Sequence, residues 1–182
     1  MTQKNKIIAK ILAPLALALV AVLSGCAGGA AGGGAGGTIE QTSAPAMGVS
    51  PSSVTVKAGD QFDVNVVLKT INPVRAAGCE LLWAGTGKIE CVDKVSEGDF
   101  FKSAGKTIKI GGDYDAATGT KGQVAVSSLA EKGAKGEGTL VTFHFKAVTP
   151  GEVTLKIFHV QVTDLLDKEI SITPCNGKVV VQ

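Results

Sequence analysis

Few residues of this 182-residue chain could bind a metal or catalyse a reaction. His144 and His159 are the only histidines, and no Cys-x-x-Cys or His-x-x-x-His spacing occurs, so a zinc site is not expected. An EF-hand that began at Asp113 would need glycine and glutamate where Thr118 and Val124 stand. The sequence therefore predicts no metal site and no cofactor, and a hairpin turn near Asp113.

Enzyme signatures are equally sparse. Gly85-Thr86-Gly87-Lys88 lacks the serine or threonine that follows the lysine of a phosphate-binding loop. The spacing of acidic residues along the sequence does not by itself decide whether two carboxylates form a pair for glycoside hydrolysis. However, a compact domain of this size, filled by its own side chains, has little room for a cleft. We therefore expect no catalytic residues and no enzyme.

Cys26 is the cysteine with the most informative surroundings. Three lysines precede an apolar stretch from Ile11 to Val22, which is shorter than the roughly 20 residues that cross a bilayer. Residues 1–25 thus have the layout of a secretory signal peptide. The ending, Leu23-Ser24-Gly25-Cys26, resembles the bacterial lipobox, which implies cleavage before Cys26 and acylation of its thiol. An ordinary signal peptide with a chance cysteine is the alternative.

The expected product is an extracytoplasmic lipoprotein, anchored to the cell membrane or an outer membrane, because two or more acyl chains give lasting attachment. Residues 26–47 are expected to form the lipidated cysteine and a flexible tether. Ala27 to Gly37 contains only alanine and glycine, which leaves almost nothing to bury. A flexible-coil estimate gives an end-to-end distance of roughly 23–27 Å for the tether.

Residues 48–182 are expected to form one domain with a sizeable core. Without the three lysines of the signal peptide, 15 of the 18 basic residues remain against 16 acidic ones, so the mature chain is nearly neutral. No basic stripe with interleaved aromatic residues occurs. Nucleic acid is therefore not expected as a partner.

The hydrophobic pattern of this domain has a period of two, which is typical of β-strands. Phe62, Val64, Val66 and Leu68, for example, alternate with mostly polar residues. About nine short β-branched segments separated by glycine-rich turns, without a convincing amphipathic helix, predict an all-β fold, a β-sandwich with jelly-roll topology. The candidate strands are residues 54–57, 62–69, 79–84, 88–95, 107–110, 123–129, 139–147, 152–163, 169–173 and 178–181.

Five of these segments, taken in order, resemble parts of a cohesin domain. They are Pro51–Asp60 (the opening), Gly78–Trp83 (the third strand), Ile89–Phe101 (the fourth strand and its turn), Gly138–Lys146 and Asn176–Val181 (the closing strand). The resemblance covers nearly all of Val49–Gln182. One departure is Ala84-Gly85-Thr86, where cohesins usually carry Tyr-Asp-Pro. Carbohydrate-binding modules share the architecture, so the fold by itself does not decide the function.

The resemblance implies a nine-stranded sandwich whose exposed face, from strands eight, three, six and five, binds a dockerin module that carries its own calcium. A membrane-anchored surface protein of this kind would serve extracellular assembly or polysaccharide processing. Two alternatives remain open: a sandwich that binds carbohydrate, and a structural envelope lipoprotein without a dockerin. With one tryptophan and one tyrosine, the chain is poor in the aromatic platforms that bind polysaccharide.

Strand parity places the implied docking face on this chain. If Cys79, Leu81 and Trp83 point inward, Glu80 and Leu82 point outward. Leu82 would be the apolar anchor and Glu80 would give polar specificity. If Ala125, Ser127 and Leu129 point inward on a later strand, the alternate residues complete the site. A slip of one residue would exchange the inward and outward residues of that later strand. The predicted partner-binding residues are Glu80, Leu82, Val124, Val126 and Ser128.

Three further cysteines remain after Cys26. The cohesin layout implies that Cys79 and Cys91 lie in opposing sheets, which makes them the first candidates for a disulfide in an exported domain. Cys79 with Cys175 is the second pairing. Three buried, reduced thiols are the third outcome, and the sequence leaves the choice open.

Overall fold

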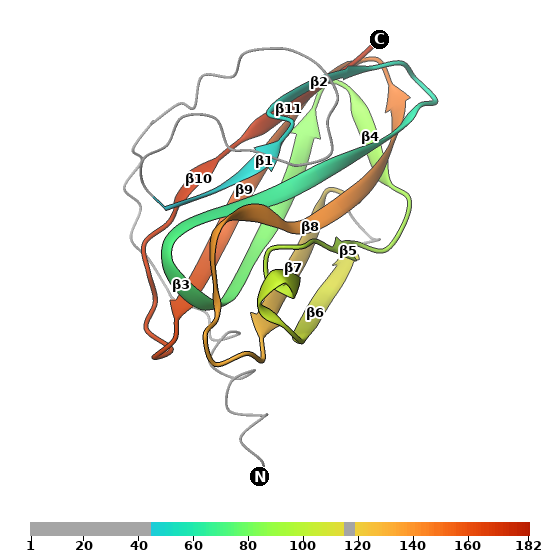
Figure 1. Ribbon diagram of the computed structural model, residues 1–182. Coiled ribbons are helices and arrows are strands. Elements are labelled where there is room, and N and C mark those ends of the chain that lie inside the picture. Colours follow the sequence, from blue (N-terminus) through green and yellow to red (C-terminus); the bar gives the residue numbers. More distant parts are fainter. Residues whose placement is uncertain (1–44, 115–118) are drawn as a thin grey trace.

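The computed structural model describes residues 45–114 and 119–182 (Figure 1). The predicted signal peptide, the predicted lipidation site Cys26 and most of the predicted tether lie outside these residues. Within them, no helix is long and apolar enough to cross a membrane.

The described chain is built almost entirely of strands, which confirms the predicted all-β fold. A single turn of 3₁₀ helix, η1 (Lys102–Ala104), interrupts them. The sequence suggested about nine strands, and the structure divides the described residues into eleven. They are β1 (Ala46–Ser50), β2 (Ser53–Val56), β3 (Gln61–Gly85), β4 (Lys88–Cys91), β5 (Ser96–Glu97), β6 (Thr107–Tyr114), β7 (Lys121–Ser128), β8 (Ala134–Thr149), β9 (Gly151–Asp164), β10 (Thr173–Cys175) and β11 (Gly177–Val181).

Strand β3 belongs to both layers of the sandwich. Its first half pairs with β1 and β8, and its second half pairs with β7 and β9. The register with β8 shifts between Thr70 and Val74, where β3 bends back on itself (Figure 1). Because one strand can join two packed sheets through such a bend, the two segments predicted at 62–69 and 79–84 form one continuous strand.

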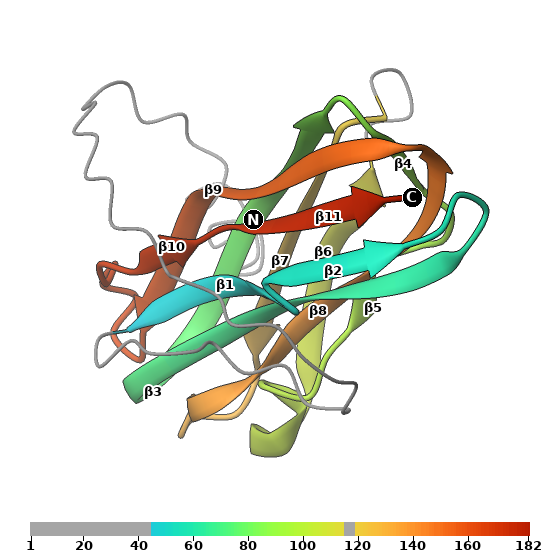
Figure 2. The same ribbon diagram turned by 90° about the horizontal axis from the view of Figure 1, so that it is seen from above.

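The remaining strands extend each layer outward from β3. The first layer contains β10, β1, the first half of β3 and β8, with β4 and β5 beyond β8. The second layer contains β6, β7, the second half of β3, β9, β11 and β2. Figure 2 shows β11 between β9 and β2, and β10 beside β1.

The first strand corrects the predicted domain boundary. Ala46 and Met47 are fully buried, and they pair with Lys69 and Leu68 of β3. The folded domain therefore includes these residues and does not begin at Gly48. Alanine and methionine carry little intrinsic strand preference, so only the tertiary pairing reveals this strand.

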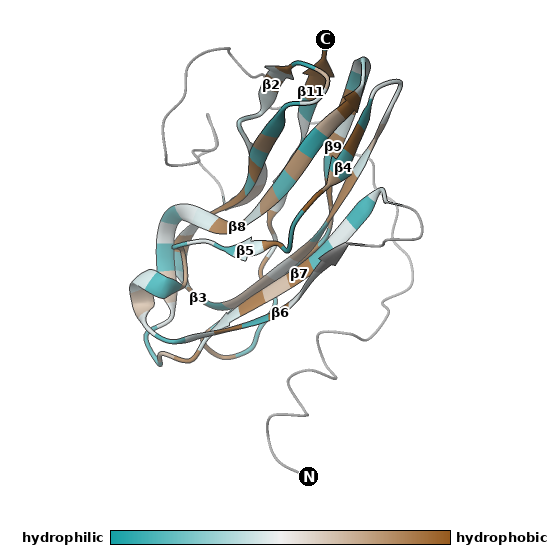
Figure 3. Ribbon diagram, turned by 90° about the vertical axis from the view of Figure 1, so that its right-hand side faces the viewer, coloured by the Kyte–Doolittle hydropathy of each residue, from teal (hydrophilic) through white to brown (hydrophobic). Residues whose placement is uncertain are grey.

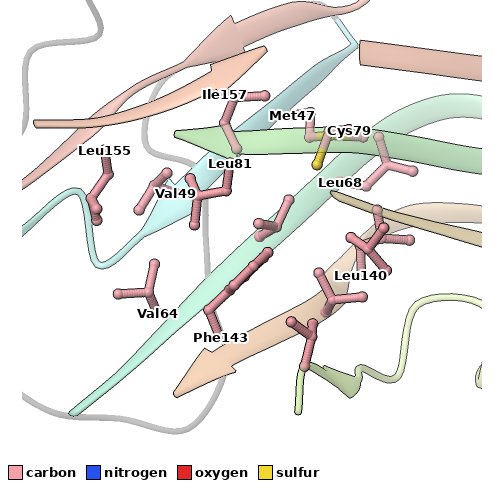
Figure 4. Close-up of a cluster of buried hydrophobic side chains, with 14 of the residues drawn as sticks. Met47, Val49, Val64, Leu68, Cys79, Leu81, Leu140, Phe143, Leu155 and Ile157 are labelled. Carbon is pink, nitrogen blue, oxygen red and sulfur yellow. The ribbon is translucent and has the colours of Figure 1, made fainter. Parts of the chain in front are cut away.

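The core lies between the two layers. Apolar and polar residues alternate along β8, as Figure 3 shows, and the apolar ones point inward. Trp83 meets Phe143 and Phe145 edge-on, with ring centroids 6.4 and 5.0 Å apart. Side chains from β1, β3, β8 and β9 converge in the core (Figure 4). Cys79, Leu81 and Trp83 are all buried, which confirms the inward parity predicted for that segment.

The cysteines do not form the first candidate disulfide. Cys79 and Cys91 are buried thiols that are not joined to each other. Burial raises the pKa of Cys79 to about 12, with a smaller contribution from the charge of Glu80, and burial also raises the pKa of Cys91. Cys175 packs in a separate cluster with Ala46 and Val67, so the second pairing, with Cys79, is not formed either.

Candidate functional site

The candidate site is the outer face of the second layer, formed by β6, β7, the second half of β3 and β9. We call it the β6–β9 face. Cross-strand pairing sets its rows, because residues directly opposite each other share a face. Glu80 of β3 lies between Gln123 of β7 and Phe158 of β9. Leu82 lies between Lys121 and Lys156 in the next row.

The prediction for β3 is confirmed in its orientation. Glu80 and Leu82 lie on the outer face and are half-buried, between the buried residues Cys79, Leu81 and Trp83. The large apolar side chains of the inner set specify this register, because slipping by one residue would expose them to water.

The prediction for β7 is wrong by one residue. Val124, Val126 and Ser128 are only 1, 1 and 4 % exposed, so they face the core and cannot contact a partner. The strand buries its two valines because they carry more apolar surface than Ala125 and Ser127. Leu129, which suggested the opposite parity, lies just beyond the last residue of β7. Its side chain therefore gives no information about which residues of β7 face the core.

The outward residues of β7 are instead Gln123, Ala125 and Ser127. Ala125 lies opposite Gly78, and a Cβ added to Gly78 would stand 3.1 Å from the Ala125 Cβ. The centre of the β6–β9 face is therefore built of small residues. Side chains of another molecule could approach the sheet closely there.

Edge strand β6 carries apolar residues on its outer side, and the sequence analysis did not assign them to the site. Ile108 and Ile110 are 39 and 37 % exposed, and they lie opposite Ser127 and Ala125. Between them, the ammonium group of Lys109 donates a hydrogen bond to the Val95 carbonyl. A strand that faces water usually shows the opposite arrangement, with its polar side chains outward. The alternation of isoleucine with lysine was the available signal.

Strand β9 borders the site on the other side through Phe158, which is 40 % exposed. The Lys156 ammonium lies 5.6 Å from the centre of its ring. The pairing of β3 with β9 shifts register here, and His159 adopts a positive φ of 46°. This bulge brings His159 to the surface, where its Nδ1 lies 3.2 Å from Glu80 Oε2.

Around His144, the outer face of the first layer is polar. His144 Nδ1 lies 2.7 Å from Asp63 Oδ1, and its Nε2 lies 3.1 Å from Ser96 Oγ. The expectation that His144 is an ordinary outward strand residue agrees with this position. Beside it, the Thr142 hydroxyl donates to Asn65 Oδ1 over 2.7 Å.

The order serine, histidine, aspartate also occurs in hydrolases, where backbone N–H groups stabilise the oxyanion. Here the nearby amides of Gly98 and Phe100 already donate to the carbonyl oxygens of Leu140 and Thr139. The Asp63 side chain is 62 % exposed, so water competes for its contacts. These groups therefore satisfy one another on the surface, and we assign them no catalytic role.

The described side chains offer no aromatic platform for a sugar. Phe158 is the one phenylalanine, tyrosine or tryptophan side chain among them that is exposed. Trp83, the only tryptophan of the chain, is buried against Phe143 and Phe145.

Neither a protein-family model nor a curated protein matches this sequence. Solved structures do match its fold. A non-cellulosomal cohesin from the archaeon Archaeoglobus fulgidus superposes with a TM-score of 0.62 at 13 % identity, over 77 % of this chain and 92 % of that one. A type II cohesin domain from the cellulosome of Acetivibrio cellulolyticus gives 0.63 at 10 % identity, over 75 and 95 % of the two chains. This chain has the cohesin fold.

A third match to the cohesin fold shows such a domain with its partner. The sixth cohesin from scaffoldin B of Acetivibrio cellulolyticus was solved in complex with a mutant Cel5 dockerin. It matches with a TM-score of 0.60 at 12 % identity, over 77 % of this chain and all of that one. If β1 and β2 count as one strand, β3 as two, and β4 and β5 as one, then β9, the second half of β3, β7 and β6 are strands eight, three, six and five of a cohesin sandwich.

Proposed function

We propose that this protein is a membrane-anchored surface lipoprotein whose cohesin-like domain docks a dockerin-bearing partner on the β6–β9 face. The observation that carries the proposal is the exposure of Ile108, Ile110 and Phe158 on one sheet face while Lys109 turns inward. Exposed apolar side chains that gather on one face mark an interaction surface.

The polar residues of the face suit this function. Protein interfaces combine an apolar centre with a polar rim. Leu82, Ala125 and the two isoleucines supply apolar surface, and Gln123, Lys121 and Lys156 supply polar groups around them. Glu80 is half-buried and already paired with His159, so a cationic or hydroxyl group of the partner would share its carboxylate.

Calcium would belong to the partner and not to this chain. Among the described residues, no group of three or more His, Cys, Asp or Glu side chains could hold a metal ion. A chelator should therefore weaken docking without changing the stability of this protein. Several of the matching cohesin structures are complexes with dockerins, which supports the choice of partner.

The experiment is a titration of the purified protein with a panel of dockerin modules, followed by calorimetry with calcium and with EDTA. Ile110→Asp is the test variant, and Val148→Asp is its matched control, since both side chains are 37 % exposed. We expect Ile110→Asp to weaken binding at least about thirtyfold, as for other apolar anchor residues of interfaces, and Val148→Asp to bind as the parent does. Equal losses in the two variants, or no dockerin bound at micromolar concentration, would contradict the proposal.

A further inference from the structure

The three most exposed large apolar side chains of the described residues lie at one end of the sandwich. Leu166, Ile71 and Leu129 are 87, 65 and 57 % exposed. Val74 pairs with Asp164 of β9 and with Ala134 of β8, and so brings together the bend that carries Ile71 and the two loops that carry the leucines. In Figure 1 this end lies at the bottom, away from the C-terminus.

The turn that carries Leu166 holds this side chain in water. Asp164 Oδ1 accepts hydrogen bonds from the backbone N–H groups of Leu166 and Lys168, at 2.8 and 2.9 Å. The Asp164 N–H donates in turn to the Lys168 carbonyl over 2.9 Å. The neighbouring Leu165 packs over Gly133, where an added Cβ would stand 2.6 Å from its Cδ2. Leu165 is thus packed, whereas Leu166 is exposed. Because the turn is already fixed by hydrogen bonds, binding through Leu166 would cost little conformational entropy.

The chain enters the folded domain at this same end. The Thr173 N–H donates to the Pro45 carbonyl over 3.1 Å, and Ala46 pairs with Lys69 next to the bend of β3. Cys26 lies 19 positions before Pro45, a distance that an extended chain spans in about 63–68 Å at most. Whatever holds Cys26 therefore stays within reach of Leu166 and Ile71.

We propose that the end of the sandwich that displays Leu166 and Ile71 rests on the lipid bilayer in which the acylated Cys26 is anchored. This inference rests on the lipid anchor of the proposed function. Two apolar side chains bind a bilayer weakly by themselves, because affinity scales with the apolar area that they bury. The anchor makes their contact intramolecular, and short linkers give effective concentrations in the millimolar range.

Charge does not drive this contact. Lys132, Lys135 and Lys168 are exposed at this end, and Glu131, Asp167 and Glu169 are exposed beside them. Zwitterionic phosphatidylcholine vesicles should therefore suffice. The contact would also orient the domain, because the strands of the β6–β9 face run between this end and the opposite one. The face would then stand upright on the membrane, open to a partner from the side.

The experiment uses the full acylated protein in phosphatidylcholine vesicles, with an environment-sensitive NBD label on Lys168→Cys, beside the displayed leucine. A label on Lys57→Cys, which follows β2 at the opposite end of the sandwich, is the positional control. Cys79, Cys91 and Cys175 are buried and Cys26 would be acylated, so the parent protein should take up little label. We expect vesicles to shift the emission of the Lys168→Cys label to shorter wavelength, and spin-labelled lipid to quench it. The Lys57→Cys label should show neither effect.

Leu166→Ser with Ile71→Ser, added to the Lys168→Cys protein, should abolish the shift. Val92→Ser with Val148→Ser, which removes two exposed apolar side chains elsewhere, should keep it. Flotation with the vesicles reports the anchor separately, so protein that does not float contradicts the anchor. Protein that floats without a shift overturns the contact. A shift that needs no vesicles and grows with protein concentration would assign this end to a second copy, and would also overturn it. Dockerin binding by the Leu166→Ser, Ile71→Ser protein should be unchanged.

Discussion

Around His144 on the outer face of the first layer, polar side chains bind one another, whereas around Ile110 on the outer face of the second layer, apolar side chains face water. Asp63, His144 and Ser96 form a hydrogen-bonded row on the first face. Ile108 and Ile110 stand on the second, without such neighbours to cover them. Both faces come from the same alternation of residues along a strand. The first is complete without a partner, and the second is the kind of surface that a partner covers.

The largest expected effect tests which side of β7 belongs to the apolar face. Val126→Asp should cost more than about 4 kcal/mol of the free energy of unfolding, because it buries an unpaired charge in the core. Ala125→Asp, one residue earlier, places the same charge outside and should change stability by less than about 1 kcal/mol. Urea denaturation measures both.

Ala125→Asp should also weaken dockerin binding, since it adds a charge at the centre of the β6–β9 face. Similar losses of stability in the two variants would mean that the register of β7 is not the one in the structure. In that case Val124, Val126 and Ser128 would return as candidates for the docking surface.

The second expected effect concerns the core that both faces share. Trp83→Ala should destabilise the protein by about 3–5 kcal/mol, as other large aromatic truncations do, because it removes the ring that packs against Phe143 and Phe145. The measurement is denaturation followed by circular dichroism. In the parent protein, the tryptophan emission should resist quenching by iodide. A loss below about 1 kcal/mol would place Trp83 at the surface.

These strands also show how far the sequence determines the site. The second half of β3 could be oriented from sequence because Leu81 and Trp83 are large and their alternates are not all apolar. In β7 both alternating sets are small, so one misplaced leucine reversed the prediction. The correct choice needed the end of the strand, which depends on its pairing with β6 and β3.

Other features depend on tertiary structure alone. The strand at Ala46 and Met47 exists because the first half of β3 offers it a partner. The bulge at His159, which places its ring beside Glu80, arises from a register shift between two long strands. The alternation of apolar residues carries no information about either. The alternation of isoleucine and lysine in β6 is visible in the sequence. However, only the position of this strand at the sheet edge shows that the isoleucines face outward.

The third expected effect lies directly beneath the β6–β9 face, at Cys79. Its pKa is raised from about 9 to about 12 by burial, so the folded protein keeps this proton at pH values where the unfolded chain loses it. Because the unfolded state then binds fewer protons, stability should fall as pH rises from about 9 towards 12. Below pH 9 both states keep the Cys79 proton, so this loss of stability does not occur.

The measurement is urea denaturation at several pH values, compared with Cys79→Val, which should show a shallower decline. Mass spectrometry after alkylation adds a direct check on the thiols. Cys79 and Cys91 should stay unmodified in the native protein at pH 8, and should react without a reducing agent once it is unfolded. A requirement for reductant would show that they are bridged.

The smallest expected effect is on the polar face. Asp63→Ala removes the carboxylate that contacts His144, but this side chain is 62 % exposed. Exposed ion pairs contribute at most about 1 kcal/mol, so we expect a stability change within that range. Dockerin affinity should be unchanged, since the proposed docking face lies on the other layer. Hydrolysis of p-nitrophenyl acetate should be the same for the parent, Asp63→Ala and Ser96→Ala.

If Asp63→Ala weakened docking as much as Ile110→Asp, the two faces would share the partner and the contrast between them would fail. If Ser96→Ala lowered the esterase rate, the row of Asp63, His144 and Ser96 would be a reactive site after all.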